Sequence, residues 1–213
     1  MNKNEKFVIT INRELGSGGR TVGRKLAKKL NVTFYDKWLI NELKKKYGLT
    51  TEEVETVKAS KSDWWRELLN AAVFMGNNMG DLSTVPEVKD QEFHLTTSEE
   101  MFNMESEIFS HLSNESCIVA GRSGFYVFRN HPNHLSVLIQ ASMPYRIERL
   151  MRKQQLSEEE ARKTIEKVDK MRENYVKKYT GTSRYDTRNY DLVITADGKS
   201  EDEIVDIIMK FIG

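Results

Sequence analysis

The chain has 213 residues, 38% of them hydrophobic and 31% charged, a composition typical of one globular domain with insertions. Its 33 basic residues nearly balance 32 acidic ones, so bulk charge gives no reason to expect binding to nucleic acid or an acidic membrane. No run approaches the roughly 20 apolar residues of a membrane span, so we expect no membrane partner. The single cysteine, Cys117, excludes an internal disulfide and favours a reducing, cytoplasmic setting.

Five short runs rich in β-branched residues predict five strands. They are residues 7–11, 32–35, 117–120, 135–140 and 190–195. Helical patterns follow these runs, and the runs are apolar rather than alternating, which is typical of parallel strands covered on both faces. The sequence therefore predicts an α/β fold with a five-stranded parallel sheet between two layers of helices.

Four capping boxes predict where helices begin. They start at Thr50, Thr97, Ser157 and Ser200, each followed three residues later by glutamate. The box at Ser200 begins an amphipathic C-terminal helix. Its apolar face is predicted to pack in the core through Ile204, Ile207, Ile208 and Phe211.

Two stretches are too long for simple crossovers between strands. Residues 44–116 far exceed the 10–12 residues that a crossover requires, so we interpret them as a helical insertion. Residues 153–188 interrupt the approach to the last strand. Residues 80–116 carry nine acidic residues and one lysine, whereas residues 144–188 carry thirteen basic and eight acidic residues. The basic segment could grip an anion; two solvated helical surfaces of opposite sign are the alternative.

A glycine-rich segment, residues 12–21 (NRELGSGGRT), lies between the first predicted strand and the helix after it. Backbone N–H groups of such a turn can point inward together, and the following helix adds partial positive charge, so a phosphate group fits without any side chain. We therefore expect the turn Gly16-Ser17-Gly18-Gly19 to bind phosphate. A purely structural glycine turn is the alternative.

This segment departs from the phosphate-loop pattern G-x-x-x-x-G-K-[ST] at specific positions. With Gly18 as the second glycine, Arg13 takes the place of the first and Gly19 that of the lysine. Arg20 is then the candidate to supply the missing positive charge. Thr21 could offer its hydroxyl to Mg²⁺.

Segments spread over nearly the whole chain resemble the cytidylate kinase-like family of P-loop nucleoside monophosphate kinases. ITINRELGSGGRTVGRKLAKKL resembles the family's phosphate loop and first helix, NVTFYDKWLI its second strand, and IVAGRSGFYVF its strand with a GR element. SVLIQASMPYRIERLMRKQ resembles the fourth strand and the arginine-bearing helix, EKVDKMRENY the lid, and NYDLVITADG the final strand. Residues 55–100 match no motif of the family.

The resemblance implies a single P-loop kinase-like domain over residues 1–213, a three-layer α/β/α sandwich with a helical insertion and a helical lid. Its core would comprise residues 5–43, 117–152 and 189–213, with a nucleotide-binding type of insertion at 44–116 and the lid at 153–188. It implies ATP and Mg²⁺ as cofactors and a small nucleotide substrate, plausibly CMP or dCMP, in a monomer or homodimer.

The resemblance also implies roles for individual side chains. The catalytic residues would be Arg20, Arg149 and Arg172. ATP would be bound by the glycine turn with Arg20, Thr21 and Arg146, and Mg²⁺ by Thr21. The acceptor would be bound by Asp36, Arg122, Asp169, Arg172 and Arg188.

Simpler interpretations of these side chains stay open. Arg122 could be an exposed arginine after a strand, and Asp36 could cap the next helix. The arginines within residues 146–152 could form a solvated face. Asp169 and Arg172, three residues apart on one helix, could pair with each other.

Two departures from the family pattern lead to alternative functions. The missing lysine favours a nucleotide-binding module that lacks turnover. Ser123 follows the GR element where cytidylate kinases have an aspartate, which leaves cytosine specificity open and suggests a kinase of a non-nucleotide metabolite.

Overall fold

The computed structural model describes residues 1–36, 102, 106, 115–121 and 123–213. Several predictions concern other positions and lie outside the described residues. They are Arg122, the caps at Thr50 and Thr97, and nearly all of the insertion at 44–116.

Five parallel strands form one sheet, as predicted. They are β1 (Val8–Arg13), β2 (Thr33–Tyr35), β3 (Cys117–Ala120), β4 (His134–Gln140) and β5 (Leu192–Thr195), in the order β2-β3-β1-β4-β5. The central strand β1 pairs with both β3 and β4, so Thr10 lies beside Val119 on one side and Ser136 on the other. Because the strands are parallel, all their carboxyl ends meet at one edge of the sheet, where open α/β sheets bind ligands.

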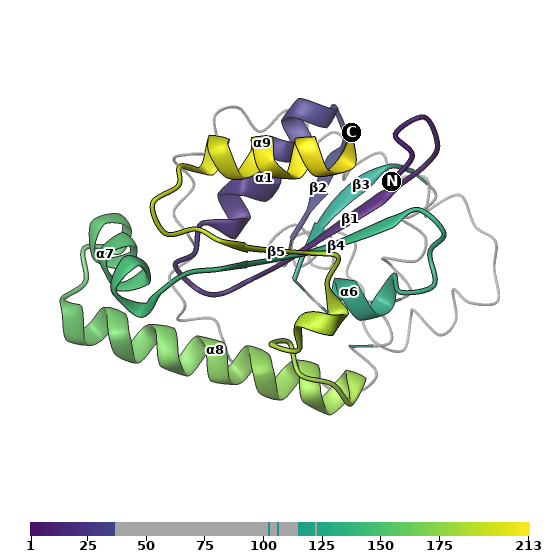
Figure 1. Ribbon diagram of the computed structural model, residues 1–213. Coiled ribbons are helices and arrows are strands. Elements are labelled where there is room, and N and C mark those ends of the chain that lie inside the picture. The colour runs from purple at the N-terminus through teal and green to yellow at the C-terminus, as the bar shows by residue number, and fades with distance from the viewer. Residues whose placement is uncertain (37–101, 103–105, 107–114, 122) are drawn as a thin grey trace, which may run out of the picture.

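Helices cover both faces of this sheet, which makes a three-layer α/β/α sandwich (Figure 1). Helices α1 (Gly19–Leu30) and α9 (Glu201–Ile212) lie side by side on one face. On the opposite side lie the short α6 (Gly124–Val127) and the long α8 (Glu158–Thr180); α7 (Met143–Gln154) joins β4 to α8. A 3₁₀ turn, η3 (Thr187–Asn189), precedes β5.

The main core fills the space between the sheet and the α1–α9 pair. Ile204 and Ile208 are buried there, as predicted, but Phe211 is 52% exposed and Ile212 is buried instead. The prediction for Phe211 is wrong because residues four apart lie on one stripe of a helix, so 204, 208 and 212 share the buried face.

A second, smaller core joins the glycine-rich loop to α7 and α8. It consists of Leu15, Ile147, Leu150, Ala161, Ile165 and Val168. The capping boxes at Ser157 and Ser200 are confirmed at the starts of α8 and α9. Among the residues described here, no helix is both long and apolar enough to cross a membrane.

Candidate phosphate-binding site

The glycine-rich segment connects β1 to α1 at the carboxyl edge of the sheet. Gly16 and Gly18 both have a φ of 84°, a left-handed conformation that favours glycine. At Gly16 a side chain is excluded by space as well, because a Cβ would lie 2.8 Å from the backbone oxygen of Arg146. The shape of the loop therefore depends on glycine at these positions.

The loop leaves backbone N–H groups without an acceptor. Within the described parts of the chain, the N–H groups of Gly16, Gly18, Gly19 and Arg20 make no hydrogen bond. Helix α1 starts after Gly18, which has no side chain to cap it, and its first turn contains no acidic residue. Unpaired N–H groups and the positive end of a helix dipole both favour an anion, so this turn can bind a phosphate group.

Other donors of the loop are used to hold its shape. The Ser17 hydroxyl donates to the carbonyl oxygen of Glu14 at 3.0 Å, and the Ser17 N–H donates to the same oxygen at 3.3 Å. Ser17 is completely buried. Although the sequence placed Ser17 among the cofactor-binding residues, both its polar donors are committed within the loop.

Arg146 of α7 holds the glycine-rich loop in place through contacts with Leu15 and Glu14. Its Nε donates to the carbonyl oxygen of Leu15 at 2.9 Å, its Nη1 lies 3.0 Å from the Glu14 carboxylate, and its Nη2 pairs with Asp169. Only 4% of Arg146 is exposed, so its helix face is not the solvated surface that was the alternative interpretation. All three nitrogens are occupied, which makes Arg146 an anchor for the loop.

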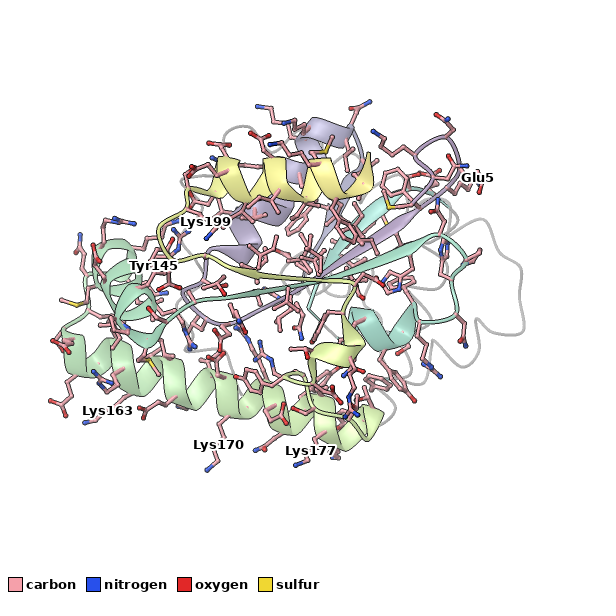
Figure 2. All side chains as sticks on the ribbon, viewed as in Figure 1. Glu5, Tyr145, Lys163, Lys170, Lys177 and Lys199 are labelled. Carbon is pink, nitrogen blue, oxygen red and sulfur yellow. The ribbon has the colours of Figure 1, made fainter. Side chains whose placement is uncertain are left out.

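Asp169 of α8 connects the predicted lid to the loop. One carboxylate oxygen accepts the Leu15 N–H at 3.1 Å and also lies near two guanidinium groups, 3.4 Å from Arg184 and 3.7 Å from Arg172. The expected pairing of Asp169 with Arg172 is thus present, as one part of a larger network. Lys163, Lys170 and Lys177 lie along the outer side of α8, away from the sheet (Figure 2).

Arg184, just after α8, is fully buried although the sequence analysis gave it no role. Its Nη2 donates to the carbonyl oxygen of Arg13, and its backbone N–H donates to Glu173 at 3.1 Å. Tyr190 accepts from Asn12 and donates to the Arg184 carbonyl oxygen at 2.7 Å; burial and, in part, Glu173 raise the pKa of Tyr190 to about 12. These contacts fix the segment after α8 against the end of β1.

Arg20 and Asp36, two predicted site residues 16 positions apart, form an ion pair. The Arg20 Nε lies 2.6 Å from the Asp36 carboxylate, of which 5% is exposed, and Arg24 approaches the same oxygen at 3.9 Å. The Arg20 Nη2 is buried with no hydrogen-bond partner in the described part of the chain. Arg20 thus extends toward the end of β2, and one of its buried nitrogens has no hydrogen-bond partner among the described residues.

Arg149 of α7 lies over the start of α1. A Cβ at Gly18 would be 3.4 Å from the Arg149 Cζ, the Arg149 Nη2 is 3.5 Å from the Thr21 hydroxyl, and the Nη1 is 2.7 Å from Glu201. Burial raises the pKa of Glu201, but the hydrogen bond from Arg149 and its positive charge lower this pKa by more, so the net shift is downward. Arg149 and Thr21, predicted to act at the phosphates, are therefore adjacent.

Arg13 is a site residue that the sequence analysis did not select. It ends β1, and its side chain runs between the positions where Gly19 and Gly121 would carry a Cβ. Its presence in place of the first glycine of the phosphate-loop pattern was the signal that could have identified it. We use the term arginine cluster below for Arg13, Arg20, Arg146, Arg149, Arg172 and Arg184.

Two predicted residues are not part of this cluster. Arg188 is paired with Asp186 at 2.7 Å, and its side chain is 88% exposed, so its role with the acceptor stays a prediction. Arg122 lies outside the described residues. Ser123, next to it, is buried in a left-handed conformation with φ 54°, and its hydroxyl has no partner among the described residues.

A magnesium ion would depend on ligands beyond the protein. In the described ranges no group of three or more histidine, cysteine, aspartate or glutamate side chains could hold a metal. Mg²⁺ is commonly held by few protein groups plus substrate phosphates, and the Thr21 hydroxyl at the start of α1 is compatible with that arrangement. Cys117 is buried, and burial and Glu115 raise its pKa to about 12.

Solved structures of other proteins match this one over nearly the whole chain. A crystal structure of an uncharacterized protein from Eubacterium ventriosum matches with a TM-score of 0.64 and 24% identity, over 97% of this chain and 98% of that one. Shikimate kinase from Acinetobacter baumannii, in complex with shikimate, matches with a TM-score of 0.47 and 14% identity, over 96% and 92% of the two chains. The enzyme from Aquifex aeolicus matches with a TM-score of 0.46 and 16% identity, over 97% and 96%.

Sequence comparison identifies the family. No curated protein matches the chain. The model of the cytidylate kinase-like family, in contrast, matches residues 8–197, which include the glycine loop, the arginine cluster and every strand of the sheet. The chain therefore belongs to the cytidylate kinase-like family, and it is a kinase-like P-loop protein of the phosphotransferase type.

Proposed function

We propose that this protein transfers the terminal phosphoryl group of ATP, with Mg²⁺, to a small phosphate-bearing acceptor, with CMP and dCMP as the first candidates. The observation that carries the proposal is the start of α1, where unpaired loop N–H groups lie beneath buried guanidinium groups. Such a site suits the several negative charges of a triphosphate chain.

In this proposal the protein acts by positioning and charge neutralisation. Phosphoryl transfer spreads charge over three equatorial oxygens, and little covalent chemistry is required of the enzyme. The N–H groups of Gly18 and Gly19 would bind the phosphates, and Arg149 would neutralise charge from α7. Arg20, whose Nη2 has no partner among the described residues, would face the transferred group. Donors that are already fixed in place need no reorganisation during the reaction.

Acceptor binding would fall to the side of the sheet where β2 and β3 end. Asp36 lies there with Arg20, and a buried carboxylate can accept hydrogen bonds from a sugar or a base. Arg172 and Asp169, on the predicted lid, would close this space from the other side. We also propose that Arg122 and Arg188 contact the acceptor, as the family resemblance implies.

A coupled assay that measures ADP release from ATP and Mg²⁺, with a panel of nucleoside monophosphates as acceptors, tests the proposal. We expect turnover with CMP or dCMP that exceeds the rate without acceptor. Arg20→Ala should lower kcat about 100-fold or more, as the loss of one charged contact in a closed site does. Arg162→Ala, on the exposed side of α8, is the matched control and should leave turnover unchanged.

Two alternatives have their own supporting observations. Glycine at the lysine position favours a nucleotide-binding module without turnover, which would bind ATP but release no ADP with any acceptor. The Ser123 hydroxyl, which has no partner among the described residues, favours a different acceptor. If ADP release occurs only with small alcohols or sugar phosphates, the protein is a metabolite kinase and the nucleotide assignment is wrong.

A further inference from the structure

Arg13 occupies the space that a lysine in the phosphate-loop pattern would need. Gly19 stands at the lysine position, and a Cβ there would lie 2.6 Å from the Arg13 Cβ and 3.1 Å from its Cγ. No side chain fits at position 19 while Arg13 keeps this conformation. The Arg13 side chain is therefore compatible with glycine at position 19 and not with the lysine of the phosphate-loop pattern.

The far end of the Arg13 side chain reaches across the edge of the sheet to the end of β3. A Cβ on Gly121 would overlap the Arg13 Nη1 and would lie 3.3 Å from its Cζ. Gly121 has a φ of 78°, so both its backbone and its surroundings require glycine. Glycines from two distant parts of the chain therefore clear a path for this one side chain.

The Arg13 guanidinium has no anionic partner among the described residues. No carboxylate lies within ion-pair distance of it, and it donates no side-chain hydrogen bond there. Arg20, Arg146, Arg149 and Arg184, by contrast, each contact a carboxylate. A half-buried cation without a partner destabilises a fold, unless an anion completes its surroundings.

The charges around Arg13 also disfavour its positive charge. Burial, the charge of Arg172 and, to a smaller extent, Arg184 and Arg20 lower the pKa of Arg13 to about 9, although the charge of Asp36 raises it. Arg13 therefore still carries its charge at pH 7. It also lies against Gly19, at the positive end of α1, where a helix dipole disfavours a cation.

We propose that the Arg13 guanidinium takes the place of the missing loop lysine and binds the phosphoryl group that is transferred, on the side of the loop that faces Gly121. This inference rests on the proposed function, because it assigns a residue to the same phosphate site. A planar guanidinium can bind two phosphate oxygens at once, and its charge would neutralise the one that develops on them. The bound phosphate would in turn supply the anion that Arg13 lacks.

Three variants test the assignment in the full-length protein: Arg13→Met, Arg13→Lys and the surface control Arg162→Met. Isothermal titration calorimetry with ATP and Mg²⁺ measures affinity, and thermal melting without ligand measures stability. We expect Arg13→Met to weaken ATP binding at least tenfold, with a Tm equal to or above that of the wild type. Arg13→Lys should keep part of the affinity because it retains the charge but not the planar fork. Arg162→Met should change neither measurement.

The outcomes separate this inference from the proposed function. If wild-type protein binds ATP and Arg13→Met binds it within twofold, the assignment of Arg13 is wrong while the phosphotransferase proposal stands. If Arg13→Met loses ATP affinity but the wild type releases no ADP with any acceptor, Arg13 is confirmed as a phosphate-binding residue and the proposed reaction is wrong. A Tm that falls by several degrees in both Arg13 variants, with ATP affinity retained, would show that Arg13 is structural.

Discussion

At the start of every helix the first backbone N–H groups have no acceptor within the helix. The starts of α1 and α8 differ in whether side chains accept from these groups. At α8 the hydroxyl of Ser157 and the carboxylate of Glu160 form a capping box, and three glutamates occupy the first turn. At α1 the cap is Gly18, with no side chain, and the first turn contains no acidic residue. We call the start of α8 closed, because its own side chains accept from its N–H groups. We call the start of α1 open, because its first N–H groups have no acceptor among the described residues and its end of the helix dipole is positive.

The comparison shows how a binding site differs from a stable helix end. Serine caps at α8 and α9 contribute stability locally, and nothing further is needed from elsewhere in the fold. The start of α1 instead has Arg149 placed over Gly18 and Arg13 against Gly19, two cations at the end of the helix that disfavours cations. An anion bound there, as we propose, would offset this charge.

The largest expected effect comes from removing the charge of Asp169, which links the middle of α8 to the loop before α1. This α8 side chain accepts the Leu15 N–H of the loop and pairs with Arg146. Asp169→Asn removes the negative charge from buried arginines and should lower the free energy of unfolding by about 3–5 kcal/mol. Urea denaturation measures the change.

Glu159→Gln is the control for Asp169→Asn, because Glu159 pairs with Lys163 on the exposed side of α8. This control should cost no more than about 0.5 kcal/mol. Equal effects of the two substitutions would show that the buried network does not hold the loop in place.

A smaller loss of unfolding free energy is expected from Gly16→Ala, which tests whether the loop before α1 requires glycine at this position. The substitution places a Cβ at a φ of 84° and 2.8 Å from the backbone oxygen of Arg146. Because a backbone atom cannot move away easily, we expect a loss of at least about 2 kcal/mol in unfolding free energy. Chemical denaturation followed by circular dichroism measures it.

Gly181→Ala, at the end of α8, is the matched control for Gly16→Ala. Its φ is 71°, but no heavy atom lies within 4 Å of the added Cβ. The left-handed strain alone should cost about 1 kcal/mol. If Gly181→Ala is as destabilising as Gly16→Ala, close packing against Arg146 is not what requires glycine in the loop.

The smallest effect is predicted for the closed helix start. Ser157→Ala removes the hydroxyl that accepts the Glu160 N–H and should lower the free energy of unfolding by about 1 kcal/mol. ATP affinity, measured by calorimetry, should stay at the wild-type value. Ser200→Ala at α9 should behave in the same way, and a loss of ATP affinity in either variant would contradict the division between closed and open helix starts.

Parts of the site were predictable because their signals are local. The glycines of the loop lie within four residues, and the hydroxyl–glutamate spacing of Ser157 and Ser200 identified two helix starts. The partners of the arginines were not predictable in this way. Asp169 is 154 residues from Leu15. Which side chains meet also decides that Arg146 is an anchor and that Arg13 has no carboxylate partner among the described residues.

The sequence by itself determined the five strands, their parallel arrangement, the starts of α8 and α9 and the position of the glycine-rich loop, because hydrophobic period, caps and glycines act over a few neighbouring residues. It also pointed to the family, through short motifs in a recognisable order. Only the tertiary structure decided the strand order β2-β3-β1-β4-β5 and which charges neutralise one another. Those outcomes depend on distances between residues far apart in the chain, and the energy of an ion pair depends on such distances and on burial.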